Sequence, residues 1–192
     1  MTINDNSVNI KRGYHHGDLR SAVIGAALKR IEGGDDLSLR EVARDVGVSA
    51  TAIYRHFPDK DALLDALAFE AAERMGAMQM AASEAAGGGR AGFSACGRAY
   101  VHFALNNAAL FRLMSSRSHL GVEADVGSST AMQFLHQSVD ALMPPGSTFA
   151  ARNAMAMHAW SLVHGLAILI LDGQLPHDMA LIDAVIDNVR MG

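Results

Sequence analysis

Apolar residues recur along most of the chain with the period of an α-helix, and no segment alternates between apolar and polar residues long enough to indicate a strand. The first apolar stripe contains Ile24, Ala27, Leu28 and Ile31. Gly33 and Gly34 follow it, and glycine readily takes the left-handed conformation that closes a helix. The pattern therefore predicts a first helix from about Asp18 to Glu32.

Two short helices are predicted directly afterwards. Ser38 and Glu41 fit a capping box, in which each side chain binds a free backbone amide, at the start of a helix over roughly residues 39–46. Gly47 ends that helix, and Ser49 can cap the next one. The inward face of this third helix consists of Ala50, Ile53 and Phe57. Two short helices joined by a tight turn and packed on a preceding helix form a helix-turn-helix.

The outward face of the third helix carries Thr51, Tyr54 and Arg55. Such a face has two interpretations: a solvated surface with an incidental tyrosine, or a surface that reads nucleic acid. The residues that follow favour nucleic acid. Pro58 ends the helix, Asp59 can cap a fourth helix, and Lys60 then lies in its first turn near His56. Free amides and the positive end of the helix dipole make Lys60 and His56 candidates for holding a phosphate.

Charge changes this picture only slightly. A net charge of −4 is unusual for a protein that binds nucleic acid. The distribution is uneven, because residues 8–60 contain nine Lys and Arg against seven Asp and Glu, whereas residues 61–192 contain seven against twelve. The modest basic excess is therefore confined to the front third of the chain.

The remaining composition predicts a soluble cytoplasmic protein without a membrane partner. The first ten residues are polar and lack the apolar segment of a secretory leader. The longest nearly apolar run, from Ala159 to Leu171, is too short to span a bilayer. Cys96 is the only cysteine, which fits a reducing compartment.

The stretch LSLREVARDVGVSATAIYRHFPDKDALL, Leu37 to Leu64, closely resembles the DNA-binding signature of the tetracycline-repressor (TetR) family of transcriptional regulators. The arm KRGYHHGDLR resembles the start of many members. The resemblance implies double-stranded operator DNA as a partner and a DNA-binding domain over residues 1–60. The positions that it implies for DNA contact are Lys11 and Arg12 in the arm, Arg40 at the start of the second helix, Thr51, Ala52, Tyr54 and Arg55 in the major groove, and His56 and Lys60 on phosphates.

Residues 61–192 are expected to form a separate and larger helical domain. The fourth helix begins with a stripe made of Leu63, Leu64, Leu67 and Ala71 and ends before Gly87. Further helices are expected near residues 91–105, 108–114, 122–142, 148–171 and 178–190. The whole chain is thus expected to be all-α, with about nine helices in two domains and no internal repeat.

Methionine and aromatic residues are concentrated in the second domain, where ten of the eleven methionines lie between Met75 and Met191. Such residues either fill a core or line an adaptable apolar pocket. AWSLVHGLAILIL resembles a TetR subgroup with a Trp-x-x-x-His-Gly motif, which favours a pocket for a small apolar effector. The candidate lining residues are Phe103, Phe111, Met114, Met155, Met157, Trp160 and His164. His164 needs a polar partner, either a core carbonyl or a ligand.

The last two predicted helices indicate self-association. The final helix has an apolar stripe opposite Asp183 and Asp187, and the helix before it is apolar nearly all round. An intramolecular core could absorb both, but the family resemblance implies a four-helix interface between two copies of the chain. The residues assigned to this dimer interface are Leu162, Leu166, Leu169, Leu181, Ile182, Val185, Ile186 and Val189.

An enzyme is the main alternative class, and the sequence does not support it. His158 and His164 are six residues apart and lack the neighbouring glutamate that metal-dependent hydrolases use. Nucleophile and phosphate-cradling motifs are missing as well, so neither a metal nor a cofactor is expected. The resemblance predicts a homodimeric repressor that binds palindromic DNA and is released by the effector. A ligand-independent dimeric DNA-binding regulator is the alternative.

Overall fold

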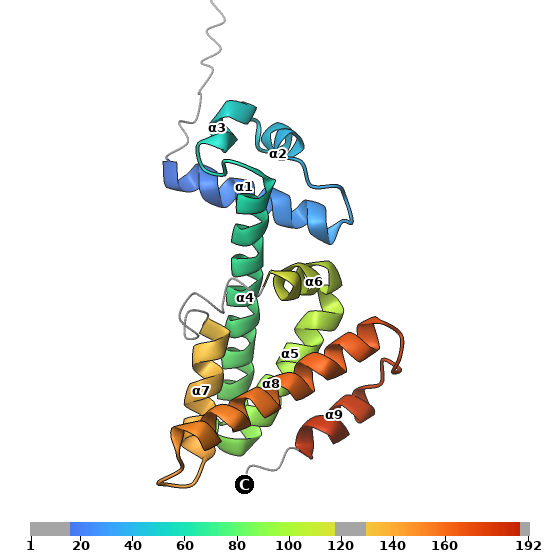
Figure 1. Ribbon diagram of the computed structural model, residues 1–192. Helices are drawn as coiled ribbons and strands as arrows, with labels where there is room; N and C mark the ends of the chain where they lie inside the picture. The colour runs from blue at the N-terminus through green and yellow to red at the C-terminus, as the bar shows by residue number, and fades with distance from the viewer. Residues whose placement is uncertain (1–15, 118–129, 189–192) are drawn as a thin grey trace, which may run out of the picture.

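In the computed structural model, residues 16–117 and 130–188 are described, and within these ranges the chain forms nine α-helices and no strand (Figure 1). The helices are α1 His16–Glu32, α2 Leu39–Val46, α3 Ala50–Tyr54, α4 Lys60–Ala85, α5 Gly89–Asn106, α6 Ala108–Ser116, α7 Thr130–Leu142, α8 Phe149–Leu171 and α9 Met179–Asp187. The expected all-α architecture is confirmed. Residues 122–129, which belong to an expected helix, lie outside the described residues.

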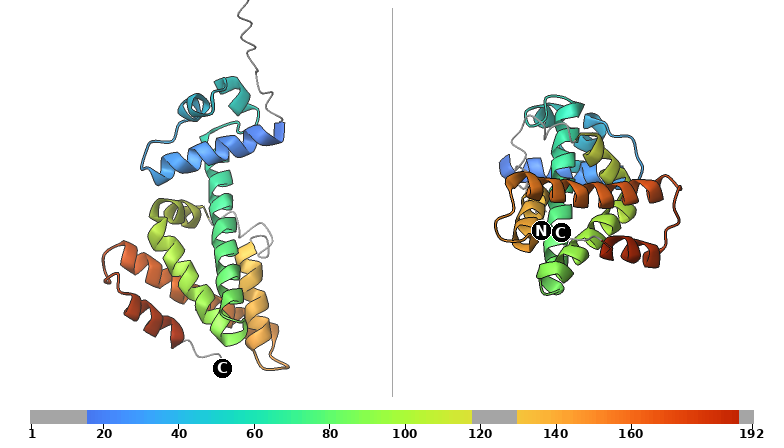
Figure 2. Two further views of the ribbon diagram at one scale, coloured as in Figure 1. Left: turned by 180° about the vertical axis from the view of Figure 1, so that it is seen from behind. Right: turned by 60° about the horizontal axis from the view of Figure 1, so that its bottom comes forward.

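The long helix α4 connects two groups of helices. Figures 1 and 2 show α1, α2 and α3 gathered around its first turns, while α5, α6 and α7 pack along its length. Helices α8 and α9 pack on α5, farther from the N-terminal helices. A displacement of α4 would therefore move the N-terminal helices relative to the rest of the molecule.

The three N-terminal helices and the start of α4 share one core. Its largest fully buried side chains are Val23, Leu28, Val42, Ile53, Phe57 and Leu63. Helix α3 covers only five residues, so Phe57 lies beyond its end, although its ring is buried as expected. The ring also receives the guanidinium of Arg20 at 5.4 Å from its centroid, which attaches the turn after α3 to α1.

Side-chain caps fix the starts of α3 and α4. Ser49 Oγ accepts a hydrogen bond from the Ala52 amide at 3.2 Å, and Asp59 Oδ1 accepts one from the Ala62 amide at 2.8 Å. Both caps were expected from the sequence. Gly47 ends α2 with a φ of 77°, in the left-handed region that favours glycine.

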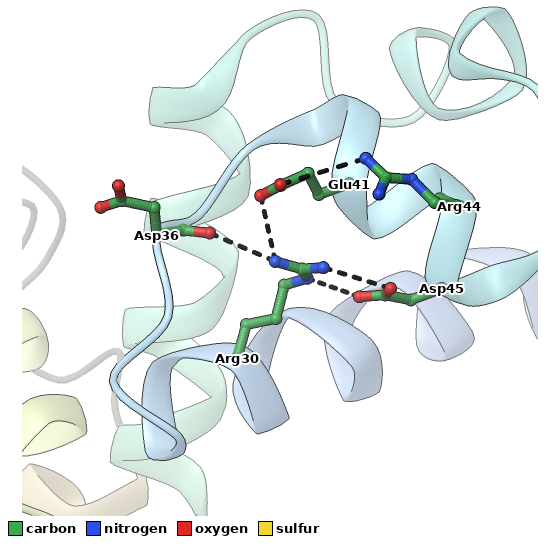
Figure 3. A network of polar contacts seen from close by, with 5 residues as sticks. All are labelled: Arg30, Asp36, Glu41, Arg44 and Asp45. Atoms are coloured by element: carbon green, nitrogen blue, oxygen red, sulfur yellow. Dashed lines mark hydrogen bonds and ion pairs between the residues drawn. The ribbon is translucent and has the colours of Figure 1, made fainter.

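The capping box expected at the start of α2 is wrong. The Ser38 side chain makes no capping hydrogen bond. Glu41 instead accepts a hydrogen bond from Arg30 of α1 at 3.0 Å, and Arg30 also binds Asp45 at 3.2 Å and the carbonyl oxygen of Asp36 at 3.4 Å (Figure 3). A guanidinium offers a carboxylate a stronger, charge-assisted bond than a backbone amide does. The hydrogen bond from Arg30 also lowers the pKa of Asp45.

Small residues let the helices of the second domain approach closely. A Cβ atom at Gly92 of α5 would lie 2.5 Å from Ser83 Oγ and 3.0 Å from the Ser83 carbonyl oxygen on α4. A Cβ atom at Gly97 would lie 3.3 Å from Ile186 of α9. Helix α9 is also attached to α5 by Arg98, which binds Asp183 at 2.7 Å and Asp187 at 3.0 Å.

Helix α8 is longer and more apolar than the run from Ala159 to Leu171 suggested. Its 23 residues are enough, by length and composition, to cross a membrane, so the argument from that shorter run was too narrow. Within the protomer, 33% of its most apolar stretch is buried. One such helix is weak evidence for a membrane span, because the core helices of soluble proteins share this composition. The exposed large apolar side chains of α8 are Phe149, at 82%, and Leu169, at 38%.

We expect Gly92→Ala to lower the free energy of unfolding by about 1–3 kcal/mol, because the added methyl group overpacks the contact with Ser83. Gly25→Ala in α1 is the matched control, since a Cβ atom there meets nothing within 4 Å. Better helix propensity should make that variant more stable by about 0.5–1 kcal/mol. Thermal and urea unfolding measure both values. An increase in stability for both variants would contradict the close α4–α5 contact.

Candidate nucleic-acid interface and ligand site

The outward side of α3 and its flanks presents the side chains that the sequence assigned to DNA. Thr51 and Arg55 are exposed, and Tyr54 keeps 45% of its surface in contact with solvent. Arg55 is the capping residue directly after α3 rather than part of the helix. Ala52 and His56 are half-buried. The tyrosine is large, apolar and exposed, which suits a contact with another molecule.

An open groove of about 350 Å³ lies between the starts of α2 and α4. The residues that line it are Ser38, Leu39, Arg40, Tyr54, Pro58, Asp59 and Lys60. The structure thus brings together Arg40, Tyr54 and Lys60, which come from three different segments. We call the exposed residues Arg40, Thr51, Tyr54, Arg55 and Lys60 the reading surface.

The cations of the reading surface are available to a polyanion. In the described part of the chain, no ion pair joins Arg40, Arg55 or Lys60 to a carboxylate. The one carboxylate in the groove, Asp59, is the cap of α4, where the positive end of the helix dipole partly offsets its charge. The reading surface therefore has a local excess of positive charge, although the net charge of the N-terminal part of the chain is small. Lys11 and Arg12 lie outside the described residues.

An aromatic array surrounds His164 in the second domain. His164 Nδ1 is 2.8 Å from the hydroxyl of Tyr100, and Trp160 Nε1 donates a hydrogen bond to the same hydroxyl at 3.4 Å. The ring centroids of Phe111 and His164 are 5.4 Å apart. We call Tyr100, Phe111, Trp160 and His164 the aromatic array. The polar partner of His164 within the protomer is therefore the phenol of Tyr100, not a core carbonyl.

Burial determines the charge of this array. Desolvation raises the pKa of Tyr100 to about 12, against a smaller opposite effect of the hydrogen bond from Trp160. Desolvation also lowers the pKa of His164. Both side chains are therefore neutral at neutral pH.

The other expected ligand residues lie at different depths. Phe103 and Met114 are buried in the main core. Met157 is half-buried and lies on the same face of α8 as His164. Met155 lies nine residues before His164, which places it on the opposite side of α8. Tyr100 was missed as a site residue. The apolar pattern of α5 could have predicted that Tyr100 is buried with Cys96 and Phe103. Its contact with His164 could not be predicted from that pattern.

The expected dimer residues also divide by burial. Leu166, Ile182 and Ile186 are 5%, 0% and 3% exposed, so the core of the protomer already holds them. Leu162, Leu181 and Val185 are half-buried, and Leu169 is 38% exposed. Val189 lies outside the described residues.

A helix-turn-helix with exposed cations, joined by one long helix to a larger helical domain, defines a DNA-binding protein of the transcriptional-regulator class. Residues 25–67 match the family described as bacterial regulatory proteins, tetR family, and residues 93–189 match the tetracyclin repressor-like C-terminal domain. The chain belongs to the TetR family of transcriptional regulators, which are not enzymes.

Relatives agree with this assignment. The chain is 31% identical over 102 residues to an uncharacterised helix-turn-helix-type transcriptional regulator of Haemophilus influenzae, a match that spans 52% of the chain and only 50% of that relative. A solved structure from Rhodococcus sp. RHA1, of unknown function, is 35% identical with a TM-score of 0.72, over 92% of this chain and 93% of that one. A TetR family regulator from Marinobacter aquaeolei VT8 shares the fold, with a TM-score of 0.64 at 17% identity over 88% and 91% of the two chains.

We expect Lys60→Ala to weaken binding to operator and random duplexes to a similar degree, because a phosphate contact carries no base information. The slope of log affinity against log salt should become shallower by about one unit. Operators are first selected from random duplexes, and salt titrations then give the slopes. Lys29→Ala, an exposed lysine in the last turn of α1, is the control that should leave the slope unchanged.

Thr51→Ala and Tyr54→Ala complete the comparison, since side chains in the groove should alter sequence preference more than the salt slope. An unchanged slope for Lys60→Ala would remove Lys60 from the phosphate contacts.

Proposed function

We propose that the protein is a homodimeric, ligand-responsive repressor that binds palindromic operator DNA in the cytoplasm and is released when a small apolar effector enters residues 61–192. Residues 1–60 bind DNA in this proposal, and residues 61–192 bind the effector and the second copy. The observation that carries it is a continuous chain of contacts through α6, which touches the aromatic array with one side and the first turn of α4 with the other.

The array side of α6 is formed by Phe111. Its ring lies edge-on to Tyr100, at 5.7 Å between centroids, and tilted against His164. Arg112, the next residue, binds the carboxylate of Asp172 at 2.6 Å and reaches the carbonyl oxygen of Leu171 at 3.4 Å. A molecule inserted beside Phe111 would therefore push on α6 and on the end of α8 together.

The DNA side of α6 is formed by Arg117, the residue that caps its end. The Arg117 guanidinium donates to the Asp61 carboxylate at 2.6 Å and to the Asp61 carbonyl oxygen at 3.2 Å, and it also binds the Asp65 carboxylate. Asp61 directly follows Lys60 of the reading surface. A shift of α6 would thus be passed to the turn that carries Lys60 and the Asp59 cap.

Release of DNA then follows from a population shift. The effector must bind more tightly to a conformer in which the two reading surfaces of the dimer no longer fit the spacing of adjacent major grooves. That spacing is about 34–36 Å, or one helical turn, for two recognition helices on one face of DNA. An effector with equal affinity for both conformers would change nothing.

The surface that α8 leaves exposed supports the dimer. Leu169 is exposed in its last turns, and the small residues Ala154, Ser161 and Gly165 allow another helix to approach. Because Ile182 and Ile186 are buried in the protomer, Leu181 and Val185, which are half-buried, are the expected α9 residues that a second copy could still cover. A second copy would cover this apolar face, so the hydropathy of α8 is explained without a membrane.

A ligand-independent dimeric regulator is the second candidate. It is favoured by the burial of Phe103, Phe111 and Met114 in one packed core, which leaves core packing as a sufficient explanation for these side chains. The two candidates share the dimer and differ in the response to an effector.

We expect Leu169→Glu to give folded monomers, because a carboxylate on the dimer face would be buried without a partner. One reading surface alone makes too few contacts, so the variant should lose most of the roughly 1,000-fold or greater preference of such proteins for operator over random DNA. Sedimentation and operator titration measure the two effects. Met78→Glu is the matched control, since Met78 is similarly exposed, at 43% against 38%, but lies on α4. A dimeric Leu169→Glu variant would exclude this face.

We expect a small apolar compound that changes the emission of Trp160, the only tryptophan, to release operator DNA over the same concentration range. Operator DNA must then weaken binding of the compound by the same factor. Arg117→Ala should reduce this mutual factor while compound binding is retained. Arg152→Ala is the control, because Arg152 also bonds a carboxylate and a carbonyl oxygen, on Asp140 and Ser147, away from α4. Tight compounds without any effect on operator affinity would favour the ligand-independent regulator.

A further inference from the structure

The hydrogen bonds of the aromatic array run in one direction. The indole of Trp160 can only donate, so the hydroxyl oxygen of Tyr100 accepts from it. The single hydroxyl hydrogen of Tyr100 is then available to His164 Nδ1, which lies 2.8 Å away and can accept it when the ring is the Nε2–H tautomer. The opposite arrangement would make the phenol oxygen accept twice and turn its hydrogen away from both neighbours. The sequence of donation is therefore from Trp160 to Tyr100 to His164.

This direction determines the tautomer of His164. A neutral imidazole has one N–H donor and one acceptor nitrogen. Because Nδ1 accepts from Tyr100, the proton of the ring is on Nε2. His164 is half-buried, so the ring is not sealed inside the core. The array thus has one polar group that its internal hydrogen bonds do not use, and that group is a donor.

The rings around His164 favour a neutral partner. In the described residues, the aromatic side chains that pack on it are Tyr100 from α5, Phe111 from α6 and Trp160 from its own helix, and none of them carries a charge. A carboxylate would lose its hydration without meeting a positive charge. An ammonium is attracted to aromatic faces, but at Nε2–H of His164 it would meet a donor, so only an uncharged acceptor satisfies that group. The half-buried ring of Trp160 offers a flat apolar surface beside His164, which suits an aromatic or conjugated molecule.

We propose that the aromatic array binds a neutral, mainly apolar molecule through a hydrogen-bond acceptor such as a ketone or ester carbonyl, which accepts from Nε2–H of His164, with Tyr100 as the residue that positions this proton. The proposal rests on the proposed function for the location of the effector, and adds the chemical class of molecule that the site takes. Tyr100 acts through His164 and does not touch the ligand.

Four probes of the same carbon number test the proposal: butyrophenone, butylbenzene, 4-phenylbutyrate and 4-phenylbutylamine. Calorimetric titration of the full-length protein gives the dissociation constant of each. Among the probes, we expect butyrophenone to lose about 3- to 10-fold in affinity in His164→Phe, the effect of one neutral hydrogen bond, while butylbenzene changes by less than about 2-fold. The anion and the ammonium should bind weakly to every variant.

Two further variants separate a polar contact from a structural role. His164→Gln places an amide N–H near the position of Nε2 and should restore most of the affinity for butyrophenone. Tyr100→Phe leaves His164 in place but removes the bond to Nδ1, so nitrogen NMR should show a mixture of the two ring tautomers in place of the single Nε2–H form of the wild type. Thermal unfolding of all variants reports whether they remain folded.

Each outcome decides the proposal. A loss confined to the ketone, with rescue by His164→Gln, supports it. Equal losses for butyrophenone and butylbenzene, no binding of butyrophenone to the wild type, or a proton on Nδ1 in the wild type would each overturn it. Operator affinity is measured in parallel. Ketone binding that depends on His164 but leaves operator affinity unchanged would contradict the proposed function alone, whereas operator release by all four probes would contradict the ligand class alone.

Discussion

The ion pairs of Arg117 with Asp61 and Asp65 determine how the end of α6 meets the start of α4. The Arg117 side chain is 20% exposed, but Asp61 is 79% and Asp65 40% exposed, so solvent screens this contact as it does other surface ion pairs, and its role is to fix geometry. It occupies the turn of α4 that also holds the Asp59 cap and Lys60. One helical turn therefore carries both the attachment to the second domain and the contact proposed for a phosphate.

The N-terminal helices are held on the same turn from the other side. Arg30 binds α2 to α1 through Glu41 and Asp45, and Phe57 lies under Arg20 just before α4 begins. These contacts and the shared apolar core hold α1, α2 and the segment that carries α3 together. A body of this kind can move with α4 without losing its internal arrangement. In the proposed dimer, movement of α4 would change the distance between the two reading surfaces while each surface stays intact.

The sequence predicted those features that depend on neighbours along the chain. Helical period, the Ser49 and Asp59 caps and the exposure of Thr51 and Tyr54 are local properties, and the structure has all of them. Contacts between distant segments could not be predicted in the same way. Glu41 fits a local capping box with Ser38, but the packing of α1 places Arg30 beside it. Tyr100 and His164, which are in contact, are 64 residues apart in the sequence. Pairing across such separations depends on how the helices pack, which a periodic pattern does not specify.

The same limit applies to the residues expected at a dimer interface. An apolar stripe predicts that a helix side will be covered, but it does not say by which surface. On α9, the stripe residues Ile182 and Ile186 turn toward α5, where Gly97 removes the side chain that would otherwise block them and Arg98 binds the polar side of the helix. Because these α9 residues are covered within the protomer, the apolar surface that stays exposed lies on α8, which is apolar on nearly every side and only partly buried. In the proposed dimer, two copies of the chain would cover this part of α8 for each other when their exposed faces meet.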